Sequence, residues 1–484
     1  MAGSYDYDIG IIGGGAAGLT VASGAAQLGA KTLLIEKEPA LGGDCLHYGC
    51  VPSKTLIRSA HVYHDIKQAD RYGLPVVDLP PVDFAGIARR IRDVIAVIQE
   101  HDSEARFCKL GAKVVFGRAF FKNPHTVDLD GRPISAKKWV IATGSSAAIP
   151  PIPGLREIET ITNREIFSLK RLPDRMVVLG AGPIGIEMAQ AFGRLGTRVT
   201  VVDRGEQILG KEDPDMAAAV QAVLTAEGVG FHLGAAIERV AAVGGCSTVT
   251  ITTAAGATVD LQADTVLVAM GRAVNIDGLG LEAAGVAVAR SGIVVDTRLR
   301  TSQKHIYAAG DVNGGYQFTH AAGYEGGVVV SNAVLHLPRK VDYTWLPWCT
   351  YTDPELACIG MNESALTAAG IEHTVWSEAF VDNDRALAEG RSEGRIKLIL
   401  DKRDKPLGVQ ILGHRAGDLI AEWVAVLNGK VRLSTLASAI HPYPTLGEIS
   451  KGVTGSVFSP KIFSERVQKG LKFFFNLKGR ACEE

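Results

Sequence analysis

A glycine-rich motif that occurs twice in the 484 residues limits most strongly how this chain can fold. The first copy is Gly13-x-Gly15-x-x-Gly18. Around it the sequence predicts three elements: a strand over 7–12, a helix from about 19 to 28 and a strand over 31–35 that ends at Glu36. Such a unit binds a dinucleotide, because the glycines let the backbone approach a pyrophosphate, the helix N-terminus attracts it and the acid accepts ribose hydroxyls.

The second copy repeats the first in spacing as well as in motif. Its glycines are Gly180, Gly182 and Gly185, and a helix over 186–195 and a strand over 198–202 are predicted to follow. Gly13 to Glu36 and Gly180 to Asp203 both span 23 residues. One chain with two dinucleotide sites is expected to hold an electron donor against an electron acceptor.

Neighbouring segments indicate which cofactor belongs to which copy. The segments WVIATG (139–144) and HIYAAGD (305–311) resemble those of flavoproteins, so the first copy is expected to bind FAD and the second, with TVLVAMGR (265–272), a nicotinamide cofactor. The FAD residues are predicted to be Gly13, Gly15, Gly18, Glu36, Lys37, Gly43, Thr143, Gly144 and Asp311. The nicotinamide residues are predicted to be Gly180, Gly182, Gly185, Asp203 and Gly271.

Asp203 bears on the choice between NADH and NADPH. A carboxylate at this position pairs with a free ribose 2′-hydroxyl and repels a 2′-phosphate, which favours NADH. Arg204 follows directly and is long enough to reach a phosphate, so NADPH stays open.

Charge and hydropathy exclude several classes of function. Lys plus Arg number 51 and Asp plus Glu 52, so no long-range field attracts nucleic acid. No segment reaches the roughly 20 apolar residues that span a bilayer, and the N-terminal segment is acidic rather than basic. We therefore expect a cytoplasmic protein without a membrane span.

Cys45 and Cys50 lie in the segment GGDCLHYGCVPSK. Zinc sites normally use shorter spacing and a second cysteine pair, and the other five cysteines are isolated. Pro52 predicts a helix start, which places Cys50 near a helix N-terminus that favours a thiolate. Lys54 falls on the same helix face. These features indicate a redox-active pair.

This segment, with the order of motifs along nearly the whole chain, resembles the pyridine nucleotide-disulfide oxidoreductases, which include dihydrolipoyl dehydrogenase, glutathione reductase and mercuric reductase. The resemblance implies that Cys45 is the thiol that faces the substrate and that Cys50 is the thiol beside the flavin. It also implies that Lys54 pairs with Glu187. Electrons then pass from nicotinamide to flavin, to the cysteine pair and to an acceptor.

The segment HPYPTLGE (441–448) departs from the disulfide-reducing members of the family. Tyr443 holds the position of their catalytic histidine, His441 lies two residues earlier, and Glu448 keeps its place. A neutral phenol titrates near 10, so it is a poor proton shuttle at pH 7. Mercuric reductases carry a tyrosine here, and reduction of a metal ion needs soft thiolates rather than a shuttle.

Three hypotheses follow. The first is a mercuric reductase-like enzyme that reduces a thiol-bound metal ion. The second is a dihydrolipoyl dehydrogenase-like enzyme in which His441 or water replaces the usual base. The third is a non-redox nucleotide-binding component of a complex. Mercuric reductases usually carry a cysteine pair near the C-terminus, whereas here Cys482 stands alone, so the acceptor stays open.

The predicted fold class is α/β, with two Rossmann-like domains and a C-terminal α/β dimerisation domain. The expected segments are an FAD domain (1–150), a nicotinamide domain (151–272), a segment completing the FAD domain (273–345), an interface domain (346–465) and a tail (466–484). We expect a homodimer whose active site is shared across the interface. The aromatic face of the tail is expected to pack on the protein's own body, with a membrane or partner contact as the alternative.

Overall fold

The computed structural model describes residues 5–479 and 481–482, and the chain divides into two compact units. The first consists of Met1–Ala69, Pro75–Gly210 and Leu224–Tyr343, and the second of Asp70–Leu74, Lys211–Val223 and Thr344–Glu484. Helix α7 (Pro214–Ala226) begins in the second unit and ends in the first.

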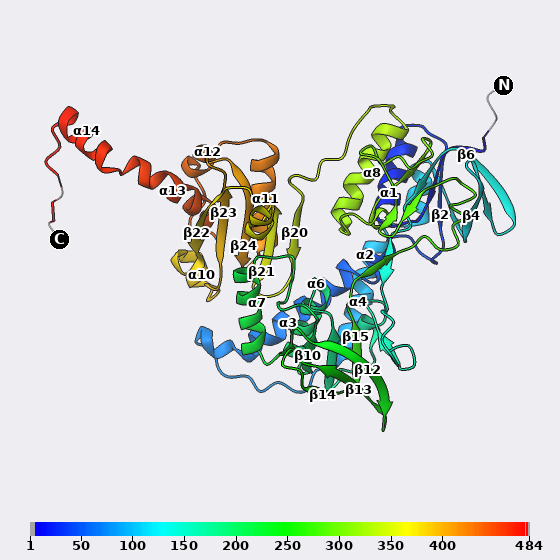
Figure 1. Ribbon diagram of the computed structural model, residues 1–484, viewed down its shortest axis with the longest axis horizontal. Coiled ribbons are helices and arrows are strands. Elements are labelled where there is room, and N and C mark those ends of the chain that lie inside the picture. The colour runs from blue at the N-terminus through cyan, green and yellow to red at the C-terminus, as the bar shows by residue number, and fades with distance from the viewer. Residues whose placement is uncertain (1–4, 480, 483–484) are drawn as a thin grey trace. The chain divides into compact units, whose positions relative to one another are not determined.

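The first unit contains a seven-stranded sheet in the order β3-β2-β1-β6-β5-β4, with β19 paired to β6. Its parallel strands are β1 (Tyr7–Ile12), β2 (Thr32–Glu36), β3 (Ala112–Phe116), β6 (Arg132–Ile141) and β19 (Ile306–Ala308). Strands β4 (Ala119–Asn123) and β5 (Thr126–Leu129) extend it in antiparallel fashion. Helices α1 (Ala16–Gln27) and α8 (Thr319–Ala333) pack together in one core cluster (Figure 1).

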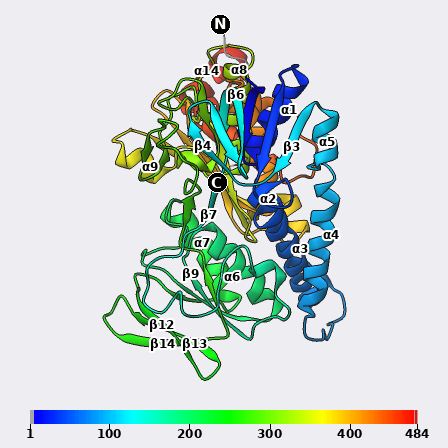
Figure 2. The same ribbon diagram turned by 90° about the vertical axis from the view of Figure 1, so that its right-hand side faces the viewer.

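A second parallel sheet in the same unit has the order β11-β10-β9-β15-β8. Its strands are β8 (Thr160–Ile161), β9 (Arg175–Leu179), β10 (Arg198–Val202), β11 (Gly230–His232) and β15 (Thr265–Val268). Helix α6 (Pro183–Leu195) packs on it, and β12 (Ala236–Val243), β13 (Cys246–Thr252) and β14 (Thr258–Ala263) form a separate antiparallel layer (Figure 2). Strand β7 (Ser145–Ala147) precedes this sheet in the chain and β16 (Arg272–Val274) follows it, and the two strands pair antiparallel.

The cysteine segment lies on a helical layer of the first unit. Helices α2 (Gly43–His47) and α3 (Cys50–Lys67) follow each other with two residues between them. Helix α4 (Phe84–Gln99) runs beside α3, and α5 (Glu104–Lys109) leads into β3 (Figure 2). The short α2 and its break at Tyr48 and Gly49 bring Cys45 back toward the start of α3.

The second unit is a five-stranded antiparallel sheet in the order β20-β21-β24-β23-β22. The strands are β20 (Pro347–Thr350), β21 (Glu355–Gly360), β22 (Thr374–Ala379), β23 (Arg395–Leu400) and β24 (Pro406–Gly413). The helices are α9 (Glu363–Ala368), α10 (Asp384–Ala388), α11 (Ala416–Asn428), α12 (Leu433–Ser438), α13 (Glu448–Ile462) and α14 (Glu465–Phe475). Side chains of α11 and α13 fill the core against β21, β23 and β24.

The predicted α/β fold class is confirmed, with two differences in detail. The helices after the glycine motifs begin at Ala16 and Pro183, three residues earlier than predicted, because Gly15 and Gly182 are their N-caps. The expectation that the aromatic tail packs on the protein's own body is wrong: no side chain of α14 is buried. Residues 480, 483 and 484 of the tail lie outside the described part of the chain. No helix of the described residues is long and apolar enough to cross a membrane.

Candidate functional site

The first and third glycines of each motif are required by backbone packing. Gly13 has a φ of +110°, and a Cβ there would meet the Ala142 carbonyl oxygen at 2.3 Å. A Cβ at Gly18 would come within 1.9 Å of the Gly13 carbonyl oxygen. Gly180 and Gly185 repeat this arrangement, with a φ of +111° at Gly180 and a Cβ-to-oxygen distance of 2.0 Å at Gly185.

The middle glycines serve a different purpose, because they leave space at a helix start. Gly15 and Gly182 cap α1 and α6, and neither helix has a side-chain cap. A Cβ at Gly15 would meet only the Gly43 Cα, at 3.8 Å, and one at Gly182 would meet nothing within 4 Å. Open backbone N–H groups at a helix N-terminus fit a pyrophosphate, so both sites fit a dinucleotide.

The two predicted acids occupy equivalent places. Glu36 is buried and its Oε2 accepts a hydrogen bond from the Gly14 backbone N–H at 2.6 Å. The Asp203 Oδ2 accepts one from the Ala181 N–H, also at 2.6 Å, and its Oδ1 accepts from Gly205. Both carboxylates are thus fixed at the end of the second strand, beside the glycine turn.

Asp311, one of the predicted FAD residues, belongs to a polar network. Asp311 accepts a hydrogen bond from the Ser145 hydroxyl at 2.5 Å, and Arg272 contacts the same carboxylate at 3.7 Å. Arg272 also donates to Asp44 at 2.9 Å, and Asp44 directly precedes Cys45. The network therefore links Asp311, one of the predicted FAD residues, to the cysteine segment.

The structure places the other predicted cofactor residues as follows. Thr143 donates its hydroxyl to the Asn275 carbonyl, and Gly144 and Gly271 both have positive φ angles. Gly43 begins α2, and a Cβ there would lie 2.7 Å from the Gly15 Cα, so the cysteine helix starts directly against the first glycine turn. Lys37 is exposed beside Glu36.

Cys45 and Cys50 are both free thiols, and each is the strongest influence on the pKa of the other. Cys45 is half-buried at the middle of α2, and Cys50 is the exposed first residue of α3. The neighbouring Cys45 thiol lowers the pKa of Cys50 to about 6, with help from Thr319 and Lys54. Interaction with Cys50, together with burial, raises the pKa of Cys45. Cys50 is therefore the thiolate of the pair at neutral pH.

Lys54 and Glu187 are brought together as the sequence comparison with the family implies. The Lys54 Nζ lies 2.7 Å from the Glu187 Oε2, and Glu187 is buried on α6. Lys54 lies one helical turn after Cys50, where its charge favours the thiolate, and the charge of Glu187 opposes it.

Thr319 is a residue of this site that the sequence analysis missed. Its hydroxyl lies 3.4 Å from the Cys50 sulfur, although 269 residues separate them in sequence. Thr319 is also the first residue of α8. No local motif marks it. The only sequence signal is its place eight residues after Asp311, at the start of a helix.

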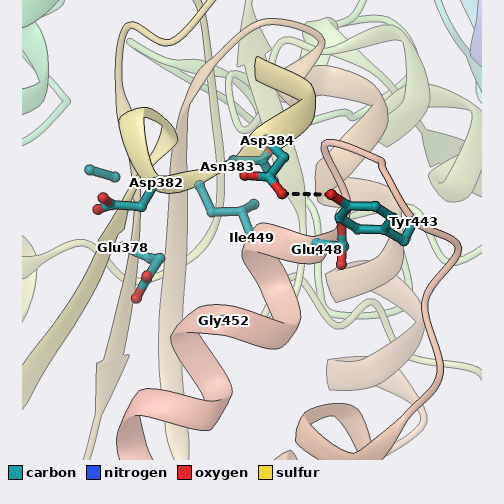
Figure 3. A pocket seen from close by; sticks show the side chains of 9 residues that line it. Glu378, Asp382, Asn383, Asp384, Tyr443, Glu448, Ile449 and Gly452 are labelled. Atoms are coloured by element: carbon teal, nitrogen blue, oxygen red, sulfur yellow. Dashed lines mark hydrogen bonds between the residues drawn. The ribbon is translucent and has the colours of Figure 1, made fainter. Parts of the chain in front are cut away.

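Tyr443 and Glu448 line a pocket of about 150 Å³ in the second unit. The Tyr443 hydroxyl donates a hydrogen bond to the Asp384 Oδ2 at 2.8 Å, and this bond raises the pKa of Tyr443 (Figure 3). Glu448 is the first residue of α13. The other lining residues are Glu378, Ala379, Asp382, Asn383, Ile449 and Gly452. Asp384 and its role on Tyr443 were not predicted.

His441 is not among the described residues that line this pocket. Its Nε2 lies 2.9 Å from the Glu422 Oε1 on α11, and its Nδ1 contacts the Ala439 carbonyl. Among the described residues that line the pocket there is no histidine. The structure therefore places Tyr443 and Glu448 in one pocket and pairs His441 with Glu422.

Among the described residues there is no group of three or more His, Cys, Asp or Glu side chains placed to hold a metal ion. Cys482 is exposed.

Comparison with known proteins identifies two matching family models. The pyridine nucleotide-disulphide oxidoreductase model matches residues 7–326, and the dimerisation domain of that family matches residues 346–453.

Relatives of two kinds match at similar identity. A mercuric reductase from Bacillus cereus is 35% identical over 448 residues, which is 92% of this chain and 70% of the relative. Dihydrolipoyl dehydrogenase 2, mitochondrial, from Arabidopsis thaliana is 35% identical over 473 residues, which is 95% of this chain and 92% of the relative. Among solved structures, the HOCl-induced flavoprotein disulfide reductase RclA from Escherichia coli superimposes with a TM-score of 0.84 and 28% identity, covering 93% of this chain and 100% of RclA.

Proposed function

The chain belongs to the pyridine nucleotide-disulphide oxidoreductase family, and on that premise we propose that it uses NADH to reduce a soft, thiol-bound metal ion such as mercuric ion. Membership makes it an oxidoreductase that uses FAD and a pyridine nucleotide, and its dimerisation domain indicates a homodimer. The non-redox hypothesis is thereby excluded. The choice of acceptor and of NADH is our proposal.

One observation carries the choice of acceptor: the pocket holds a phenol bonded to Asp384, and the neighbouring imidazole of His441 is paired with Glu422 instead. Reduction of a disulfide releases a thiolate that must take up a proton, and an imidazole is suited to supply it. Reduction of a metal ion breaks no disulfide bond and expels no substrate thiolate, so it needs no positioned acid to protonate a leaving group. Tyr443 is therefore poorly suited to disulfide reduction, whereas it is sufficient for reduction of a metal ion.

The charge of the pocket supports the same acceptor. Four carboxylates, Glu378, Asp382, Asp384 and Glu448, line it together with Tyr443. Such a lining concentrates cations rather than neutral or anionic disulfides. In our proposal the pocket of one copy completes the Cys45–Cys50 site of the other, so the acidic wall faces the sulfurs that take up the ion.

Each residue then has a defined task. The Cys50 thiolate binds the soft ion, and Cys45 releases its proton when its sulfur becomes the second ligand. Lys54 keeps negative charge on Cys50, and Glu187 holds Lys54 in place. When bound, FAD would supply the redox chemistry: it can accept a hydride from nicotinamide and donate two electrons. Two electrons reduce a mercuric ion to the metal, which leaves the thiolates free.

Preference for NADH is supported by Asp203, whose carboxylate is fixed by two backbone N–H groups at the end of β10. A ribose 2′-phosphate brought to this place meets that negative charge. The ratio of kcat/KM for NADH and NADPH tests this part. A cytoplasmic location, where thiols stay reduced, also belongs to the proposal.

The acceptor is tested with purified holoenzyme, NADH and either mercuric ion or lipoamide. We expect wild-type turnover with mercuric ion and little with lipoamide. Tyr443→His is expected to raise lipoamide turnover by roughly 10²–10⁴-fold, the usual contribution of a general acid–base. Tyr443→Phe is the matched control that should not raise it.

A His441→Gln variant separates the two acceptors further. If lipoamide turnover of the wild type is strong and His441→Gln abolishes it, the enzyme is a disulfide reductase with a displaced base and our proposal is wrong.

A further inference from the structure

Helix α14 carries an apolar surface that nothing in the described chain covers. None of its residues is buried, and the side chains of Phe473, Phe474 and Phe475 are 83%, 77% and 69% exposed. The helix continues outward from α13, beyond the sheet of the second unit (Figure 1). Exposed aromatic residues at this density on a soluble surface mark an interaction site.

The helix is amphipathic rather than uniformly apolar. Val467, Leu471 and Phe474 recur at spacings of four and three residues, which places them on one face, and Phe475 lies next to Leu471 by the same rule. Phe473 packs edge-to-face on Phe474 with ring centroids 5.3 Å apart.

The opposite face is basic. Arg466, Lys469 and Lys472 recur every three residues along it, and Lys478 follows the helix. From 465 to 478 the only acidic residue is Glu465, whose carboxylate lies 3.2 Å from the Lys469 Nζ. The whole chain is nearly neutral, so this segment concentrates positive charge at one end.

Helix α14 lies outside the segment that matches the family's dimerisation domain. The matched dimerisation domain ends at residue 453, and α14 begins twelve residues later, at Glu465. Residues 465–478 carry a formal charge of +3, and the whole chain carries −1, so the rest of the chain carries only −4 spread over 470 residues and has no strong general excess of negative charge for the basic face.

We propose that α14 docks on an anionic lipid bilayer, lying in the plane of the headgroups. Leu471, Phe474 and Phe475 enter the boundary of the acyl chains, while the lysine and arginine side chains of the other face reach outward to lipid phosphates. Charge complementarity selects an anionic surface over a zwitterionic one. The helix attaches the enzyme peripherally and does not span the bilayer. This inference does not depend on which acceptor the enzyme reduces.

The test is sedimentation of the full-length holoenzyme with vesicles. The vesicles consist of phosphatidylcholine alone or of phosphatidylcholine mixed with phosphatidylglycerol. We expect the wild type to sediment with the mixed vesicles and to be released by high salt. Lys469→Gln/Lys472→Gln should weaken binding roughly tenfold or more, because each cation near an anionic surface contributes.

Two triple variants separate this helix from other exposed apolar residues. Phe473→Ser/Phe474→Ser/Phe475→Ser should abolish sedimentation. Leu74→Ser/Val76→Ser/Val77→Ser, which removes three exposed apolar side chains elsewhere, should not. Both variants should retain wild-type NADH oxidation.

Light scattering of the same samples completes the test. If the phenylalanine variant becomes monomeric, α14 is a contact between two copies of the chain and the proposal is overturned. Absence of wild-type sedimentation with anionic vesicles, or equal sedimentation with both vesicle types, overturns it as well.

Discussion

Cys50 in the first unit and Cys358 in the second are both hydrogen-bonded thiols, and their surroundings move their pKa values in opposite directions. Cys50 is exposed at a helix start and is approached by the Cys45 thiol, the Thr319 hydroxyl and the Lys54 ammonium. These partners stabilise a negative sulfur and lower the pKa to about 6.

Cys358 is buried on β21, and burial raises its pKa well above the usual range. Its thiol donates to the Glu212 Oε2 at 3.1 Å, so a thiolate there would face a carboxylate. Burial also raises the pKa of Glu212, which accepts a second hydrogen bond from the Trp348 indole. The comparison teaches that the partners of a cysteine, as donors or acceptors, decide whether it reacts or only packs.

The largest expected effect separates the two cysteines by function. Cys50→Ser should lower acceptor reduction by at least about 10²-fold, because the reacting sulfur is lost. Cys358→Val should leave kcat unchanged and lower the free energy of unfolding by about 1–3 kcal/mol, since the buried Glu212 loses a donor. Steady-state kinetics and urea unfolding measure the two effects. Loss of turnover in Cys358→Val would contradict the claim that Cys358 has only a structural role.

A smaller effect concerns the charge beside Cys50. Alkylation of the reduced enzyme with iodoacetamide, followed peptide by peptide, should show Cys50 reacting with a midpoint near pH 6: below it the sulfur is a thiol, above it a thiolate. Cys358 should stay unmodified across the same range. Lys54→Met removes a favourable cation and should move the Cys50 midpoint upward, and Glu187→Gln should move it downward. A midpoint above 8 in the wild type contradicts this account.

Another effect on the same midpoint belongs to Thr319. Thr319→Val removes one hydroxyl at 3.4 Å from the sulfur and should raise the midpoint of Cys50 alkylation by less than the loss of Cys45 does, because Cys45 lowers the pKa of Cys50 more than Thr319 does. Thr319→Ser keeps the hydroxyl and is the matched control. If the serine and valine variants titrate alike, the hydroxyl has no part in stabilising the thiolate.

Much of the first unit could be predicted, because its information is local in sequence. Each glycine motif and its acid lie within 23 residues, and their turn, helix and strand are fixed by steric rules that act over a few residues. The strand over 198–202 is found with the predicted bounds. The two helices begin earlier than predicted, because the first residue of a helix depends on backbone hydrogen bonds that the spacing of a motif does not specify.

The tail illustrates the opposite case. Its aromatic residues are visible in the sequence, but amphipathicity is the same whether a helix covers its own protein, a partner or a membrane. Only the exposure of α14 in the structure distinguishes the first of these possibilities from the other two.

The sequence by itself determined the two glycine motifs with their acids, the close spacing of Cys45 and Cys50, and the presence of Tyr443 two residues after His441. Only the tertiary structure decided which side chains reach them: Thr319 at Cys50, Asp384 at Tyr443 and Glu422 at His441. The physical reason is the distance in sequence over which the interactions act. Turns and caps follow from neighbouring residues, whereas the partners of a reactive side chain come from elements that meet only when the chain packs, and those partners set its charge.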